Sequence, residues 1–213
     1  MKKWMSVLFV IASTATALLT TSGESQAQTS TATEIFDAKA LSEWGHVGDA
    51  NWTLSGDVIE ANKGNGYLVS RSPYGDFKLR AEVWVDEKAN SGIFIRCQDQ
   101  QKPGTKTGYE VNIYDERPDP SYGTGAIVDV AKVNPMPKAG GKWNVMEITA
   151  KGGHFTIMLN GVVTVADGQD SRFPAGYIGL QYGAGTVKFR KIEISKIGTG
   201  NGMGERHADT SHL

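Results

Sequence analysis

The chain has 213 residues, a formal net charge of −1, and 39% apolar, 21% charged and 9% aromatic residues. This composition is that of an ordinary globular protein, and the absence of a Lys/Arg excess argues against a nucleic-acid partner. The 26 glycines exceed the usual share of about 7%, which favours many short strands joined by turns over long helices.

Residues 1–27 have the pattern of an export signal. Lys2 and Lys3 precede an apolar run that reaches Leu19, and Ser25-Gln26-Ala27 forms a small-x-small cleavage pattern. The alternative is a membrane anchor, but the apolar run is short and interrupted by Ser and Thr, so we expect cleavage after Ala27 and no membrane attachment of the mature protein. A periplasmic or secreted location follows, with residues 28–33 as a flexible start.

The rest of the chain predicts strands. Residues 77–86 alternate cleanly between apolar and polar positions, and residues 109–114 repeat the pattern. Further strands are expected at 92–97, 145–150, 155–159, 162–165, 177–181 and 187–194, with a short helix candidate at 38–43. Asn160-Gly161 between two apolar runs predicts a tight hairpin, and Gly152-Gly153 predicts a similar turn.

These strands predict one all-β domain over residues 34–197, an antiparallel β-sandwich or jelly roll. Loops are expected at 63–66, 98–107 and 118–141, the last interrupted by residues 126–133. The Gly-rich polar tail 198–213 predicts disorder. The sequence does not determine the oligomeric state.

No cofactor is expected. The single cysteine, Cys97, excludes an intrachain disulfide, and the four histidines form no close metal-ligand pair. Glycine-rich nucleotide loops and a GxSxG nucleophile motif are absent from the sequence. A structural calcium ion is not indicated, although Asp115 is a candidate either for binding a cation or for capping the loop that follows it.

Seven segments in a fixed order resemble the 3-keto-disaccharide hydrolase domain family. They are YGDFKL (74–79), NSGIFIR (90–96), GYEVNIYD (108–115), KWN (142–144), LNG (159–161), GYIGLQ (176–181) and FRKI (189–192). The resemblance implies a concanavalin A-like, laminarinase-like jelly roll and cleavage of glycosides oxidised at C3 of the sugar. In one departure, many members of the family continue with Asp-His-Gly after the residues that match Leu180-Gln181, whereas this chain continues with Tyr182-Gly183.

Strand alternation sorts the candidate site residues by face. If the polar faces of several strands coincide, one groove holds the substrate-binding candidates Glu82, Trp84, Asn112, Tyr114 and Gln181, with Asp115 secondary, beside Glu110 and Arg96. A 3-keto sugar has an acidic C2 proton, so we assign Glu110 as the base and Arg96 as the stabiliser of the enolate oxygen. The laminarinase-like pair of catalytic carboxylates has no matching motif here.

Other interpretations of the same residues stay open. Glu110 and Arg96 can form a structural ion pair between strands, and residues 90–92 can be a turn needed for shape alone. Trp44, Trp52 and Trp143 are expected in the core, and Cys97 is expected to face the core opposite Arg96. The whole domain can also be a non-catalytic carbohydrate- or partner-binding module with the same fold.

Overall fold

The computed structural model describes residues 32–36, 40–42 and 44–198. Outside this part lie the predicted export signal 1–27, residues 28–31 of the expected flexible start, and residues 199–213 of the tail. Within it, no helix has the length and apolar character that a membrane crossing requires. The one helical element there is a short 3-10 turn, η1 (Ala40–Ser42), inside the region where a helix was expected.

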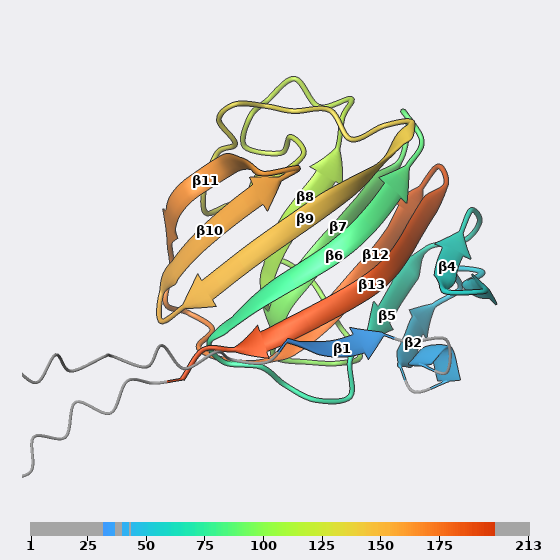
Figure 1. The fold of residues 1–213 in the computed structure, drawn as a ribbon, viewed down its shortest axis with the longest axis horizontal. Coiled ribbons are helices and arrows are strands. Elements are labelled where there is room, and N and C mark those ends of the chain that lie inside the picture. Colours follow the sequence, from blue (N-terminus) through green and yellow to red (C-terminus); the bar gives the residue numbers. More distant parts are fainter. Residues whose placement is uncertain (1–31, 37–39, 43, 199–213) are drawn as a thin grey trace, which may run out of the picture.

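The described chain forms two antiparallel sheets packed face to face (Figure 1). The larger sheet has the order β11-β10-β9-β6-β13-β4-β3, with β1 also paired to β13, and the smaller sheet has the order β2-β5-β12-β7-β8. The jelly-roll sandwich predicted from the sequence is confirmed.

The strand bounds follow chain order. They are β1 (Thr33–Phe36), β2 (Gly45–Gly48), β3 (Thr53–Ser55), β4 (Val58–Ala61), β5 (Gly66–Val69), β6 (Phe77–Val85), β7 (Asn90–Cys97), β8 (Tyr109–Tyr114), β9 (Lys142–Lys151), β10 (His154–Leu159), β11 (Val162–Gln169), β12 (Tyr177–Ala184) and β13 (Val187–Lys196). All eight predicted strands are present, each within a few residues of its expected bounds. The five strands before residue 77 were not predicted, because they are only three or four residues long.

Both predicted hairpin turns are present. Asn160 and Gly161 have φ of 52° and 78° between β10 and β11, the left-handed pair that a two-residue hairpin requires. Gly152, with φ of 54°, turns the chain between β9 and β10. Glycine adopts positive φ at no steric cost, which is why Gly152 and Gly161 predict turns in the sequence.

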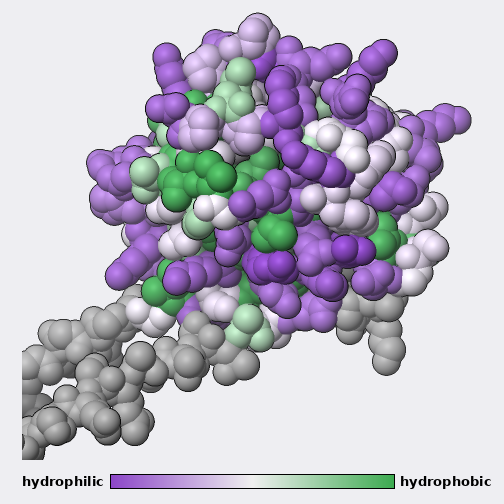
Figure 2. Space-filling model, turned by 45° about the horizontal axis from the view of Figure 1, so that its top comes forward, coloured by the Kyte–Doolittle hydropathy of each residue, from purple (hydrophilic) through white to green (hydrophobic). Residues whose placement is uncertain are grey.

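The core lies between the two sheets and follows the alternation read from the sequence. On β6, Leu79, Ala81 and Val83 are fully buried, while the alternate residues lie on the outer face. Trp44 and Trp52 are buried in this core as expected. Figure 2 shows a predominantly hydrophilic surface on the face in view, with scattered hydrophobic residues between the polar ones.

Candidate functional site

A cleft of about 370 Å³ lies on the outer face of the five-stranded sheet, centred on β8. We call it the Glu110 cleft. It is lined by Asn90, Thr105, Glu110, Asn112, Tyr114, Arg117, Tyr122, Val128, Asp129 and Gln181. Of the site residues predicted from the sequence, the structure brings together Glu110, Asn112, Tyr114 and Gln181.

Strand alternation positions Glu110. Its neighbours Tyr109 and Val111 point into the core, so the Glu110 side chain points outward, where it lies across Gly92 on β7. A Cβ at Gly92 would lie 3.1 Å from Glu110 Oε1 and 3.2 Å from its Cγ. The glycine therefore makes room for the carboxylate. Residues 90–92 belong to strand β7, so the alternative of a turn needed for shape is wrong.

The segment after β8 turns back and closes one side of the Glu110 cleft. Val128 N–H donates to the Glu110 carbonyl at 3.0 Å, and Gly125 N–H donates to the Asn112 carbonyl at 2.8 Å. The returning chain thus runs along the free edge of β8 like an added strand. A turn between Ile127 and Ala131 follows, and Asp129 in that turn lines the cleft with φ of 62°.

The electrostatic setting of Glu110 suits a base. Burial, with a smaller contribution from the negative charge of Asp129, raises the pKa of Glu110 to about 7. In the part of the chain that the structure describes, no side chain forms a salt bridge or hydrogen bond with its carboxylate. A carboxyl group with these properties can accept and release a proton near neutral pH.

Arg117 is the arginine that lines the Glu110 cleft. Its guanidinium lies 5.5 Å from the ring centroid of Tyr114 and 5.2 Å from that of Tyr122. Sequence reasoning missed Asn90, the first residue of β7, and five loop residues, because loop residues carry no periodic signal. The five are Thr105, Arg117, Tyr122, Val128 and Asp129. The position of Arg117 three residues after the predicted strand 109–114 was the one available hint.

Two amides in the Glu110 cleft have different environments. Asn112 is nearly buried, donates to the Tyr122 carbonyl and accepts from Ile113 N–H at 3.1 Å, so it holds the loop in place. The Gln181 side chain forms a hydrogen bond with the Tyr67 side chain, while its Oε1 is buried and has no hydrogen-bond partner among the described residues. A buried oxygen without a donor is costly, so Gln181 is the amide that a ligand hydroxyl would satisfy.

Arg96 does not lie in the cleft, and the predicted Glu110–Arg96 pair is wrong. The Arg96 side chain is fully buried and points between the sheets over the Phe155 ring, 5.4 Å from its centroid. It donates to the carbonyls of Gly75, Gly152 and Phe173 and forms a 3.0 Å ion pair with Asp76. These contacts tie β7 to the opposite sheet.

A β-bulge explains the error. Gly179 pairs with Phe94 and Tyr177 with Cys97, so β7 has one extra residue between these pairs. Arg96 takes the irregular conformation, with φ of 53°, and the alternation is inverted from that residue onward. Cys97 is buried as a free thiol, but on the side away from the core, against Gly108, which corrects its predicted core-facing orientation.

Glu82 and Trp84 are also misplaced by the prediction. Both lie on β6 of the eight-stranded sheet, whereas Glu110 lies on β8 of the other sheet. Glu82 accepts from Arg190 at 2.7 Å, and Trp84 lies directly opposite Trp143. Alternation assigns a face within each strand, but it cannot show which sheet the strand joins.

Two further predictions concern the rim and the core. Asp115 accepts from the N–H groups of Ala139 and Gly140, each at 2.8 Å, so it ties down the end of the long loop. Trp143, expected in the core, is instead half-buried on the outer face of β9. Trp143 was assigned to the core because it is aromatic, although it occupies an outward position of its strand.

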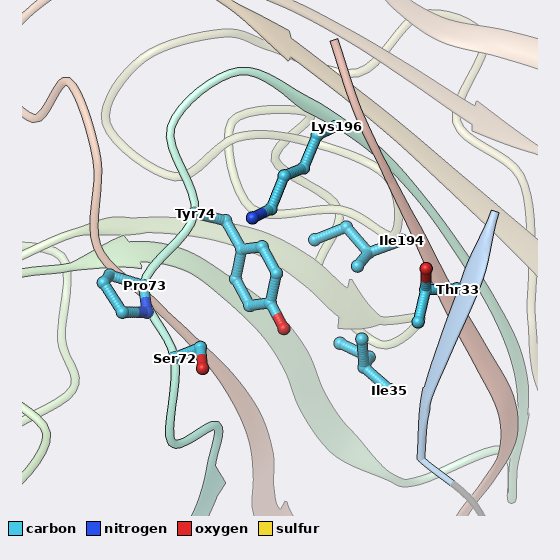
Figure 3. A pocket seen from close by; sticks show the side chains of 7 residues that line it. All are labelled: Thr33, Ile35, Ser72, Pro73, Tyr74, Ile194 and Lys196. Carbon is cyan, nitrogen blue, oxygen red and sulfur yellow. The ribbon is translucent and has the colours of Figure 1, made fainter. Parts of the chain in front are cut away.

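A larger cavity of about 470 Å³ lies beside β1 and the end of β13 (Figure 3). Its lining is Thr33, Ile35, Ser72, Pro73, Tyr74, Ile194 and Lys196, with the Tyr74 ring and the Lys196 amine among the side chains drawn. This lining contains no carboxylate that could act as a base. The described residues include no group of three or more His, Cys, Asp or Glu side chains placed to hold a metal ion.

Comparisons with known proteins bear on the fold and the family. Residues 31–195 match the family described as the 3-keto-alpha-glucoside-1,2-lyase-like domain. No curated protein matches this sequence.

Solved structures share the sandwich. A protein from Parabacteroides distasonis described as a "putative glycosyl hydrolase" is 23% identical, with a TM-score of 0.64, over 78% of this chain and 100% of its own. The carbohydrate-binding module CBM66 from Bacillus subtilis is 19% identical, with a TM-score of 0.59, over 72% of this chain and 96% of its own. At these identities the likeness establishes the fold alone.

Proposed function

Because this chain belongs to the 3-keto-alpha-glucoside-1,2-lyase-like domain family, we propose that it is an exported enzyme that cleaves glycosides carrying a ketone at C3 of the sugar. The observation that carries the proposal is Glu110, a half-buried carboxyl group with a pKa raised to about 7 in a cleft lined by polar groups. The export signal predicted for residues 1–27 adds a periplasmic or secreted location to the proposal.

The reaction is an elimination across C1 and C2 of the sugar. The C3 ketone makes the C2 proton acidic, so the Glu110 carboxylate removes it and the electron pair forms an enolate. The enolate expels the C1 oxygen substituent, which takes a proton from water, while the protonated Glu110 returns its proton to the solvent. The ring keeps a C1–C2 double bond conjugated to the ketone. Water can then add across that bond, which completes a net hydrolysis.

The raised pKa supports this role for Glu110. A carboxylate with a pKa near 7 is a stronger base than one near 4.5, yet half of it is ionised at neutral pH. General base catalysis of this kind contributes about 10²–10⁴-fold to the rate. The absence of an ion-pair partner among the described residues leaves the carboxylate available to the substrate.

Arg117 takes the electrostatic role first assigned to Arg96. As the arginine lining the cleft, it can hold the developing enolate oxygen, and its contacts with the Tyr114 and Tyr122 rings restrict its motion. The orphan Gln181 Oε1 can accept a hydrogen bond from a sugar hydroxyl. The Tyr114 ring offers an apolar surface to the sugar ring.

The alternative is a non-catalytic carbohydrate-binding module. Solved proteins named as the carbohydrate-binding module CBM66 and as mannose-bound VIP36 have the same type of fold, which is compatible with it. In addition, Gly183 stands where many members of the family have His. The two functions differ in whether bound sugar is turned over.

The test is release of the leaving group from 4-nitrophenyl 3-keto-α-glucoside, compared with the unoxidised 4-nitrophenyl glucoside. We expect turnover of the keto substrate alone, and a drop of about 10²-fold or more for Glu110→Gln. Arg117→Lys keeps the charge but loses the planar fork, and should reduce kcat. Sugar binding without turnover by the wild-type protein would favour the binding module.

A further inference from the structure

The order of the strands places the amide of Gln181 beside Glu110. In the five-stranded sheet, β5, β12, β7 and β8 are consecutive neighbours (Figure 1). Gln181 on β12 pairs with Tyr67 on β5 at one side and with Gly92 on β7 at the other. The Glu110 side chain lies across Gly92, so the amide and the carboxylate are neighbours in the Glu110 cleft.

Packing fixes the position of Tyr67 on the outer face of this sheet. Its neighbour Leu68 enters the core, so the Tyr67 ring faces outward on the same side as Gln181. The ring meets Phe94 edge to face, with centroids 5.3 Å apart and an interplanar angle of 88°. Gly179 on β12 lies close to the same ring, since a Cβ there would be 4.0 Å from Tyr67 Cδ1. These neighbours restrict the ring and therefore the place of its hydroxyl.

The hydrogen bond between Tyr67 and Gln181 determines which way the amide faces. A glutamine amide has one acceptor oxygen and one donor nitrogen. Gln181 Oε1 has no hydrogen-bond partner among the described residues, so the bond to the Tyr67 side chain uses the amide Nε2, which donates to the phenol oxygen. The orientation of the carbonyl oxygen is thereby fixed, and this oxygen is left as an acceptor for a ligand.

We propose that Tyr67 is a positioning residue that presents Gln181 Oε1 to the sugar, and that this pair selects substrates with a hydroxyl next to the C3 ketone. The inference deepens the proposed function and takes its substrate from it. Neighbouring strands lie about 4.8 Å apart, so Gln181 is one strand spacing from the Gly92 position over which Glu110 meets the C2 proton. The hydroxyls at C2 and C4 flank the ketone, whereas the C6 hydroxyl is attached through C5, across the ring from C2.

A sugar without that hydroxyl leaves the buried Oε1 unsatisfied in the complex. A buried acceptor without a donor carries a desolvation penalty, so sites built to hydrogen-bond a substrate hydroxyl strongly reject analogues that lack it. The fixed orientation also lowers the entropy cost of ordering the amide around the sugar. We therefore expect loss of the hydroxyl to weaken binding by about 10- to 100-fold.

The test measures Kd by isothermal titration calorimetry for 4-nitrophenyl 3-keto-α-glucoside and its 2-deoxy, 4-deoxy and 6-deoxy analogues. Glu110→Gln is the background variant, so that binding is measured without turnover. We expect the 2-deoxy or the 4-deoxy analogue to bind about tenfold or more weakly than the parent sugar, and the 6-deoxy analogue to bind as the parent does. Adding Gln181→Met should bring the Kd values of the parent and the weakened analogue within about threefold of each other. Adding Gln181→Glu instead, which keeps an acceptor, should retain the difference.

A double-mutant cycle separates positioning from packing. Tyr67→Phe keeps the ring on Phe94 and should weaken binding of the parent sugar by about threefold or more, but it should have no effect once Gln181→Met is present. Tyr74→Phe is the matched control, because Tyr74 is also half-buried but lines the cavity beside β1, and it should leave the Kd unchanged. Circular dichroism verifies that each variant is folded.

Binding and turnover are measured separately, so absence of turnover by the wild type would refute the enzyme proposal and leave the Kd comparison intact. The positioning role is overturned if the parent sugar does not bind, if neither the 2-deoxy nor the 4-deoxy analogue is weakened, or if Gln181→Met retains the difference. Loss of the difference in Gln181→Glu also overturns it, because the amide nitrogen would then face the sugar. Equal weakening by Tyr67→Phe in the presence and absence of Gln181→Met would show that the hydroxyl acts through packing alone, which contradicts the proposal as well.

Discussion

Replacing Arg96 tests whether it is a structural residue rather than a catalytic one. Its guanidinium is fully buried and makes four hydrogen bonds, to the carbonyls of Gly75, Gly152 and Phe173 and to the Asp76 carboxylate. Arg96→Met removes all four and keeps a side chain of similar length. Arg96→Lys keeps the positive charge, but the ammonium group lacks the planar set of N–H donors with which the guanidinium reaches all four acceptors at once.

The expected cost follows from these contacts. Hydrogen bonds to charged groups contribute about 1.5–3 kcal/mol each, and they are not additive when they share one side chain. Removing one partner of a buried ion pair costs about 3–5 kcal/mol, since the remaining groups lose their partner. We therefore expect Arg96→Met to lower the free energy of unfolding by about 3–5 kcal/mol and Arg96→Lys by about 2 kcal/mol.

Urea unfolding at equilibrium measures this free energy, and the activity assay measures kcat per folded molecule. Arg172→Met is the matched control, because Arg172 pairs with Asp170 at 2.7 Å but is 51% exposed, so its loss should cost below about 1 kcal/mol. If the free energy of unfolding of Arg96→Met lies within about 1 kcal/mol of the wild-type value, the structural role is refuted. So would a stable Arg96→Lys with a kcat as low as that of Glu110→Gln.

Five further outcomes are expected. Turnover of the 3-keto substrate should rise with pH through an inflection near 7, because Glu110 must be deprotonated. Asp129→Asn should move that inflection to lower pH, since the charge of Asp129 helps to raise the pKa of Glu110. A pH–rate profile unchanged by Asp129→Asn would contradict this. The raised pKa also means that the folded state binds the Glu110 proton more tightly than the unfolded state does. The contribution of Glu110 to the free energy of unfolding is therefore complete below about pH 4.5 and is lost as pH rises through 7. Urea unfolding at several pH values should show a weaker pH dependence of this free energy for Glu110→Gln than for the wild type. Gly92→Ala should displace the carboxylate and lower kcat with little change in melting temperature, and an unchanged kcat would argue against the close packing seen there. Gly161→Ala places a Cβ at a φ of 78° and should lower the free energy of unfolding, measured with urea, by about 1 kcal/mol. Burial raises the pKa of the Cys97 thiol to about 12, so Cys97 should react with thiol reagents only when the protein unfolds.

The sequence by itself determined the fold class. Alternation over residues 77–85 and 109–114 specifies which side chains enter the core, because the side-chain period of a strand is two. Asn160-Gly161 specifies its hairpin because both positions require positive φ. These signals are local, so they survive without knowledge of the rest of the chain.

The same local logic determined part of the site. Glu110, Asn112 and Tyr114 were assigned to one face of one strand, and the structure places all three in the cleft with Gln181. Gln181 joined them because its strand, β12, lies in the same sheet as β8. Each of these residues sits in a regular part of its strand, where alternation holds.

Only the tertiary structure decided which arginine and which carboxylates lie together in the Glu110 cleft. Glu82 failed as a site residue because sheet membership depends on long-range pairing, and β6 pairs with β9 and β13. Arg117 and Asp129 reach the cleft from a loop whose path is set by backbone hydrogen bonds to the edge of β8. Arg96 failed because one extra residue in β7 inverts the faces beyond it, and a bulge arises from the register between two strands rather than from the residues of one.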